Sequence, residues 1–315
     1  MPHDFPICIV RPRLEQHCLH PSRRRLLSSV RRGQPSSTSS LVTLMRALSH
    51  EGLTEVRDFS DPTALVFLGA PWRWMYRRTL RSMARRPDGR QRMLEKARGR
   101  MDLVALRTRF FDDAWHAAHA ARTRQLVILG AGLDGRAFRL DDISDSSLFE
   151  VDHPSTQAVK RERARSLSSK AMRHIYVPVD FERDDLGAAL AAAGHTSDQR
   201  TFWLWEGVTP YLTPEAQVAT MRALAARSAP GSRLAMTYVE PETTPPRIFD
   251  IRMMVRFFGE PFRGEMTRAT AAERLSLAGL HVVEDTGSAE WRRLYANPRA
   301  NVSDVIRERI AIAEL

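Results

Sequence analysis

The chain has 315 residues, of which 43% are hydrophobic and 27% are charged, so it is long enough for one large domain with a full core. Its formal net charge is +11. No run of 18 apolar residues occurs, which excludes a transmembrane helix, and the first residues lack the long apolar stretch of a secretory signal. We therefore expect a cytoplasmic protein with no membrane partner. The two cysteines, Cys8 and Cys18, predict no disulfide framework, and with His17 and His20 they lack the paired spacing of a metal site.

The positive charge lies in the first third of the chain. Residues 1–100 contain 20 Lys and Arg against 8 Asp and Glu, a balance of +12, whereas residues 101–315 contain 28 against 29, a balance of −1. Almost all the basic residues are arginines, because the chain has only three lysines, and this fits a compositional bias as well as a phosphate-binding surface. We therefore do not expect nucleic acid as a partner.

The N-terminal part divides into an extension and a helical cap. Residues 1–38 are basic, show no sustained periodicity and predict a flexible extension. Residues 39–121 predict the cap, because apolar residues follow helical spacing from Leu41, with Ser39 or Ser40 available as the N-cap. Further helices are expected at residues 63–68, 72–97 and 103–121, with a break at Pro87-Asp88-Gly89.

Three aromatic residues of the cap, Trp72, Trp74 and Tyr76, have two interpretations. They can line a pocket for a substrate, but aromatic residues among helices are more often part of the core, and we favour the core.

The stretch QLVILGAGLDGRAFRLDDISDSSLFEVD, residues 125–152, predicts a strand, a glycine turn and a helix. The apolar run 126–129 is typical of a strand buried on both faces, and it leads into Gly130, Gly132 and Gly135. A second strand ends in Asp152, twenty residues after Gly132, where an acidic residue can accept hydrogen bonds from a ribose. This arrangement predicts a site for a nucleoside-containing cofactor.

Residues 122–315 as a whole predict an α/β domain with a doubly wound, mostly parallel sheet. Helices and strands alternate after Asp152, and a proline-bearing insertion near 241–263 could complete the cap. The expected helices are 135–140, 154–167, 184–193, 214–227 and 267–278, and the expected strands are 126–129, 148–151, 174–179, 201–205, 233–238, 281–284 and 309–315.

Acidic residues stand at the ends of three expected strands, namely Glu150 with Asp152, Asp180, and Glu206. Because ligands bind beyond the carboxyl ends of the strands in open α/β sheets, we expect these acids to converge on one cleft. Each could instead cap the following helix. Arg107 and Arg109, before the first strand, could hold a carboxylate with their paired donors or form a solvated helix face.

Four motifs, LVILGAGLDGRAFRL, FEVDHP, VPVDF and WEGVTPYL, occur in this order, and RTRFFDD precedes them as a fifth block. In order and spacing they resemble the class I methyltransferases of the leucine carboxyl methyltransferase family, in particular its actinobacterial S-adenosylmethionine-dependent members. The resemblance runs from about Ser39 to the C-terminus. It implies a Rossmann-like methyltransferase fold that binds S-adenosylmethionine without a metal.

The resemblance also implies individual roles. The turn of Gly130, Ala131 and Gly132 would pass close to the cofactor. By the same resemblance, Asp152 would bind the ribose, and Asp180 and Phe181 would border the adenine. Arg107, with Arg109 as the fallback, would hold the methionine carboxylate, and Glu206 would lie near the amino end of the cofactor. This chain departs from the family at Gly135, where Thr or Ser is commoner, at His153, where Gln is common, and at Phe181, where Leu is common.

We therefore expect a methyltransferase that acts on oxygen of a small molecule. A carboxylate acceptor is favoured, because it is already an anion at neutral pH whereas a phenol needs a base, and the nearest histidines, His153 and His174, are weak candidates. One alternative is an NAD(P)-dependent oxidoreductase, because GAGLDG fits its fingerprint, although no Tyr-x-x-x-Lys motif was found. Another is a ligand-binding protein without turnover. The acceptor, any catalytic base and the oligomeric state are not predicted.

Overall fold

The structure, a computed structural model, describes residues 36–85, 88–241, 263–297 and 307–315. Residues 1–35 of the predicted extension, both cysteines, and residues 242–262 of the predicted insertion lie outside the described residues.

The described N-terminal region is helical, and its first helix begins earlier than predicted. Helix α1 spans Ser37–His50, and the hydroxyl of Ser36 accepts a hydrogen bond from the backbone N–H of Ser39 at 3.1 Å. The predicted cap at Ser39 or Ser40 is therefore wrong, because Ser39 is already in the first turn. Three helices follow: α2 (Ala64–Phe67), α3 (Ala70–Ala84) and α4 (Gly89–Ala120), with the predicted break between the last two.

The three cap aromatics have different environments. Tyr76 is buried, and its hydroxyl donates to Glu51 Oε1 at 2.6 Å, while burial and this contact raise the pKa of Tyr76 to about 12. Trp72 is half-buried against the cluster formed by residues of α1, α3 and the middle of α4. Trp74 is 61% exposed, so it belongs neither to the core nor to an enclosed pocket.

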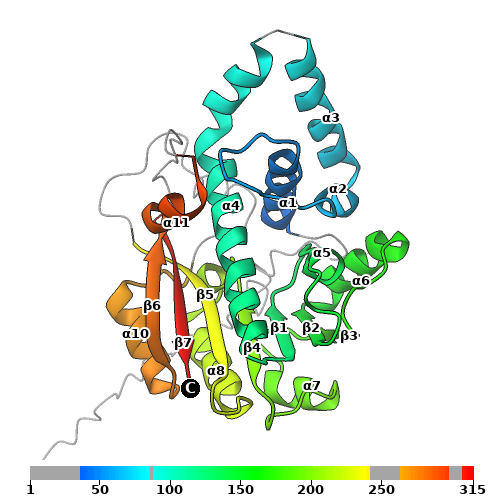
Figure 1. The fold of residues 1–315 in the computed structure, drawn as a ribbon. Helices are drawn as coiled ribbons and strands as arrows, with labels where there is room; N and C mark the ends of the chain where they lie inside the picture. Colours follow the sequence, from blue (N-terminus) through cyan, green and yellow to red (C-terminus); the bar gives the residue numbers. More distant parts are fainter. Residues whose placement is uncertain (1–35, 86–87, 242–262, 298–306) are drawn as a thin grey trace, which may run out of the picture.

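Seven strands form a single mixed sheet in the order β3-β2-β1-β4-β5-β7-β6 (Figure 1). Strands β1 to β5 are parallel to one another, and β7 runs antiparallel between β5 and β6. The predicted doubly wound, mostly parallel sheet is thereby confirmed. The bounds are β1 Gln125–Leu129, β2 Ser147–Asp152, β3 Arg173–Pro178, β4 Thr201–Trp205, β5 Arg233–Val239, β6 His281–Gly287 and β7 Glu308–Glu314.

Helices connect the strands largely as predicted. They are α5 Arg136–Arg139, α6 Pro154–Arg163, α7 Leu186–Ala192, α8 Pro214–Ala226, α10 Arg268–Leu277 and α11 Ser288–Tyr295. The helix expected at 135–140 is a single turn, because Leu140 is already extended. Helix α11 was not predicted. It starts after Gly287, whose N–H donates to Glu290 at 2.9 Å, and it buries Trp291.

The sheet is covered on both faces, as the apolar run of β1 predicts. Leu126 and Ile128 pack with residues of α4 such as Trp115, whereas Val127 and Leu129 pack with residues of α8 and α10. Strand β6 points to the upper end of the sheet in Figure 1, and it shares the direction of β5 because both are antiparallel to β7. Helices α1, α2 and α3 therefore lie at the carboxyl ends of the parallel strands.

Candidate functional site

The glycine turn follows β1 at the carboxyl edge of the sheet. Gly130 and Gly132 have φ of +64° and +45°, a conformation that side-chain-bearing residues rarely adopt. A Cβ at Gly130 would also lie 2.3 Å from Cγ2 of Val208, in the loop after β4. A Cβ at Gly132 would lie 3.0 Å from Oγ of Ser39. Side chains at Gly130 and Gly132 would therefore clash with the loop after β4 and with the first turn of α1, which both lie directly against the glycine turn.

Gly135 has a different reason. Its φ of −106° is ordinary, but a Cβ there would lie 1.9 Å from Oγ1 of Thr63. The third glycine of the fingerprint therefore makes room for the segment before α2. The literal match to a dinucleotide fingerprint is explained by packing of the cap, without reference to a dinucleotide.

Asp152 closes the turn from the end of β2. Its Oδ2 accepts a hydrogen bond from the backbone N–H of Gly132, and its Oδ1 accepts one from the N–H of His153 at 2.6 Å. Burial raises the pKa of Asp152, and the two backbone hydrogen bonds partly oppose that effect. Each oxygen keeps a second lone pair, so the carboxylate can still accept hydrogen bonds from a ligand beside the turn.

Glu206, directly after β4, is held between two arginines. Its Oε1 accepts from Arg107 Nε and its Oε2 from Arg136 Nη1, both at 2.8 Å. Arg107 also donates from Nη1 to Glu308 of β7 at 2.8 Å. Burial alone would lower the pKa of Arg107, but the carboxylates of Glu308 and Glu206 outweigh it and raise that pKa. Burial raises the pKa of Glu308, against the opposing effect of Arg107.

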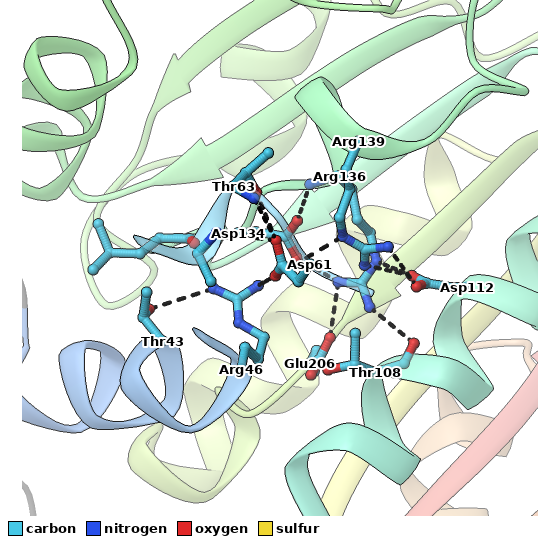
Figure 2. A network of polar contacts seen from close by, with 12 residues as sticks. Thr43, Arg46, Asp61, Thr63, Thr108, Asp112, Asp134, Arg136, Arg139 and Glu206 are labelled. Carbon is cyan, nitrogen blue, oxygen red and sulfur yellow. Dashed lines mark hydrogen bonds and ion pairs between the residues drawn. The ribbon is translucent and has the colours of Figure 1, made fainter. Parts of the chain in front are cut away.

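Arg136 is the centre of a buried ionic network, seen from close by in Figure 2. Its guanidinium is fully buried and contacts Asp112 of α4, Asp134 of the glycine turn, and Glu206. Burial would lower the pKa of Arg136, but these three carboxylates raise it well above its usual value. One side chain thereby joins the cap helix, the turn and the loop after β4.

The network continues to the N-terminal helices. Arg139 contacts Asp112 at 2.7 Å, and Arg46 of α1 contacts Asp61 at 3.2 Å and the carbonyl of Leu133 at 2.6 Å. We call the whole set the arginine network: Arg46, Asp61, Arg107, Asp112, Asp134, Arg136, Arg139, Glu206 and Glu308. It joins five carboxylates to four guanidinium groups, which leaves one formal negative charge in excess when all are ionised.

Most members of the arginine network were not singled out from the sequence. Arg136 and its partners Asp112 and Glu206 are 24 and 70 residues apart, so no local spacing connects them. The one local sign is the pair Asp134 and Arg136 inside the glycine turn, and the N–H of Arg136 indeed donates to Asp134 Oδ1 at 2.7 Å.

The strand-end acids do not all face the same way. Glu150 is fully buried behind the turn and pairs with Lys160 Nζ at 2.6 Å. Lys160 Nζ also donates to the backbone carbonyl of Ala131 at 3.5 Å, so the pair of Glu150 and Lys160 contacts the glycine turn through its backbone. Asp180 accepts from the N–H of Glu182 in its own loop at 3.1 Å. Asp152 and Glu206, by contrast, both contact the stretch 132–136 directly.

The remaining predicted residues are placed as follows. Phe181 is half-buried against the core on the α8 side of the sheet. Arg109 pairs with Asp113 at 3.5 Å and lies over the ring of Tyr295, so Arg107 rather than Arg109 reaches the end of β4. His153 caps α6 by accepting from the N–H of Ser155.

Membrane-spanning helices and metal-ion sites are both absent from the described residues. In the described ranges no helix is both long and apolar enough to cross a membrane. Within the same ranges, no group of three or more His, Cys, Asp or Glu side chains is arranged to hold a metal ion.

Comparison with known proteins identifies the family. The family described as leucine carboxyl methyltransferase matches residues 39–225, more than half of the chain. The chain belongs to this family. A relative from Mycolicibacterium gilvum, named "Putative S-adenosyl-L-methionine-dependent methyltransferase", is 47% identical over 146 residues, which cover 46% of this chain and 47% of the relative. A relative of the same description from Frankia alni is 38% identical over 208 residues, covering 65% and 70%.

The match to the first of these relatives thus spans about half of that protein's length. Among solved structures, a DUF574 family protein from Streptomyces avermitilis superimposes with a TM-score of 0.55 at 17% identity. The superposition covers 90% of this chain and 98% of that one, and at this identity it supports the fold alone.

Proposed function

We propose that this protein is an S-adenosylmethionine-dependent methyltransferase that methylates an oxygen atom of a small molecule. Membership of the leucine carboxyl methyltransferase family supports the reaction class, because both relatives described above carry that cofactor in their names. The alternative suggested by the glycine fingerprint is an NAD(P)-dependent oxidoreductase. Its cofactor would place an anionic pyrophosphate at the turn, whereas S-adenosylmethionine would not.

The observation that carries the proposal is the negative charge around the turn. A dinucleotide places its pyrophosphate on the free N–H groups of the helix after the turn. Here the carboxylate of Asp134 already accepts the first of those N–H groups, and Asp152 lies on Gly132. Because these carboxylates already occupy the N–H groups and lie beside the turn, this edge disfavours a pyrophosphate and favours a ligand with a cationic centre. S-adenosylmethionine carries one as its sulfonium.

The proposed contacts follow the geometry. Asp152 would accept hydrogen bonds from the ribose, beside the turn of Gly130, Ala131 and Gly132. Glu206 would lie near the amino group of the methionine part. The two further contacts are with the adenine, beside Asp180 and Phe181, and with the methionine carboxylate, through the N–H groups of Arg107 that Glu206 and Glu308 leave unused.

The protein's contribution to the reaction would be positioning and exclusion of water. Holding a nucleophile and the methyl group in line removes much of the entropic barrier of a displacement. Excluding water helps because the sulfonium loses its charge as the methyl group leaves. The contact between Ser39 of α1 and Gly132 supports this role, since it sets the first cap helix on the turn.

The first test compares two ligands by calorimetry. S-adenosylhomocysteine carries the ribose and the amino-acid part, whereas 5′-methylthioadenosine carries only the nucleoside and a methylated sulfur. Asp152→Ala should weaken both about a hundredfold or more, because two charge-assisted hydrogen bonds contribute roughly 1.5 to 3 kcal/mol each. Arg107→Lys keeps the charge but loses the paired donors, so it should weaken S-adenosylhomocysteine alone.

Unchanged affinities in Asp152→Ala would reject the site. Binding of NAD or NADP by the wild-type protein, with no binding of S-adenosylhomocysteine, would reject the methyltransferase and favour the oxidoreductase.

For the acceptor, we propose a carboxylate. A carboxylate is already an anionic nucleophile at neutral pH, whereas a phenol needs a base. Both histidines near the strand ends contact other groups. His153 caps α6, and Nε2 of His174 lies 3.3 Å from Oε1 of the buried Glu150. Product formed with labelled S-adenosylmethionine should therefore release volatile methanol in mild alkali, as methyl esters do. Label that survives alkali would reject the carboxylate and leave the methyltransferase standing.

A further inference from the structure

The outer side of α3 presents arginines around a tryptophan. We call this surface the α3 face, and all of its residues are exposed: Arg73, Trp74, Arg77, Arg78, Arg81 and the C-cap residue Arg85. We propose that the α3 face is a docking surface for an anionic phospholipid bilayer.

The α3 face is one continuous side of the helix. At 3.6 residues per turn its six residues fall within an arc of about 140°. The opposite side of α3 carries Trp72, Tyr76, Leu80 and Met83, which pack into the cluster shared with α1 and α4. Since the apolar side is already packed, the arginines face outward as a fixed consequence of the fold.

The stretch of sequence that carries this surface has no carboxylate of its own. From residue 62 to residue 87 the sequence contains six arginines and no acidic residue. Arg73 donates to the carbonyl of Val66 at 2.9 Å, and Arg78 lies over the ring of Trp74 at 5.6 Å. In the part of the chain that the structure describes, no arginine of the α3 face forms an ion pair with a carboxylate.

Apolar side chains on and beside the α3 face select a lipid surface among anionic partners. Trp74 is 61% exposed, and Met75 and Leu65 are 39% and 40% exposed. Guanidinium groups bind phosphates with paired hydrogen bonds, and tryptophan prefers the boundary between headgroups and hydrocarbon. A surface that offers both suits phospholipid headgroups.

The shape of the helix supports the same partner. The apolar side of α3 packs against α1 and α4, which leaves the α3 face on the outside of the molecule. Figure 1 shows α3 together with the adjoining part of α4 projecting beyond the sheet, where a flat surface can reach it. The expectation of no membrane partner rested on the absence of a spanning segment, and a surface contact of this kind requires none.

The test is co-sedimentation of the full-length protein with vesicles of phosphatidylcholine, with and without phosphatidylglycerol. The variant Arg77→Gln/Arg78→Gln/Arg81→Gln removes three charges from the α3 face. The matched control Arg165→Gln/Arg222→Gln/Arg293→Gln removes three charges from exposed positions elsewhere. We expect wild type and control to bind the anionic vesicles in a salt-sensitive manner, and the α3 variant to bind about tenfold to a hundredfold more weakly.

Trp74→Ala should weaken binding to anionic vesicles without changing the net charge. If the α3 variant and the control lose vesicle binding equally, the effect is one of overall charge and the proposal is overturned. The proposal is also overturned if neither variant loses vesicle binding. The same proteins are also tested with single-stranded and duplex DNA. Loss of DNA binding in the α3 variant with unchanged vesicle binding would overturn the lipid partner in favour of nucleic acid.

Discussion

Arginine serves two opposite purposes in this protein, in the arginine network and on the α3 face. Arg136 is fully buried and contacts three carboxylates, whereas Arg77 is exposed and forms no ion pair among the residues that the structure describes. In the arginine network the guanidinium connects segments that are far apart in sequence. On the α3 face it is an exposed charge that can be replaced with little effect on folding. The excess of basic residues in the first third of the chain therefore says little about any one arginine, because burial and partners decide its role.

The largest expected effect is that of removing Arg136. Arg136→Met leaves three buried carboxylates without their shared partner, which costs about 3 to 5 kcal/mol of unfolding free energy. The matched change Arg77→Met, on the α3 face, should stay within about 0.5 kcal/mol. Urea unfolding of both variants measures the difference. Equal losses would break the comparison between the two sets of arginines.

A second prediction concerns the contact that holds the cap on the turn. Gly135→Ala forces a methyl group against Oγ1 of Thr63, which would lie 1.9 Å away, and such overpacking typically costs about 1 to 3 kcal/mol. Adding Thr63→Ala removes that oxygen and should restore part of the loss. A double-mutant cycle by thermal unfolding measures the coupling, and purely additive effects would contradict direct contact between the two residues.

A smaller loss is expected at the start of α1. Ser36→Ala removes the side chain that caps the helix lying on the glycine turn, and N-cap losses of this kind cost about 1 kcal/mol. Ser40, inside the same helix, provides the control position for Ser→Ala. If Ser36→Ala and Ser40→Ala have the same effect on the melting temperature, the cap assignment is wrong.

The smallest expected effect belongs to an ion pair of intermediate exposure. A hydrogen bond to Asp142 raises the pKa of His116 above its usual 6.5. The pair therefore stabilises the fold fully below about pH 6.5, and this contribution is lost as the pH rises through the higher folded pKa. Because the His116 side chain is 47% exposed, the contribution should be at most about 0.5 kcal/mol. His116→Gln should abolish this part of the pH dependence between pH 6 and pH 8, measured by urea unfolding.

The sequence predicted the elements whose signal is local. Strand β1 is a continuous apolar run before a glycine turn, and Asp152 follows at a spacing that matches its observed contact with Gly132. The cap of α1 was misplaced because Ser36, Ser37, Ser39 and Ser40 are chemically equivalent candidates, and only the folded backbone distinguishes them. Helix α11 is short, and its N-cap residue, Gly287, has no side chain that could cap it, so its local signal is weak.

The arginine network was beyond sequence reasoning for a different reason. Apart from the neighbouring pair Asp134 and Arg136, its members meet partners 15 to 201 residues away, and the charge of a residue does not reveal which distant partner it contacts. Gly135 shows the same limit from the other side. The sequence showed that Gly135 belongs to the glycine fingerprint. It did not show why a glycine is needed there, because Thr63, which leaves no room for a side chain, lies more than 70 residues earlier.

The pair of Arg107 and Glu308 also bears on how the protein is made. These two residues are 201 positions apart, so during synthesis Arg107 waits for 201 further residues before this partner exists. At about 5 to 20 residues per second, that interval is roughly 10 to 40 seconds. Throughout it, the strand that separates β5 from β6 is also missing. Until residues 308–314 are made, the sheet lacks the strand beside β5 and Arg107 lacks one of its two carboxylate partners, and this is the period in which we expect chaperones to engage the chain.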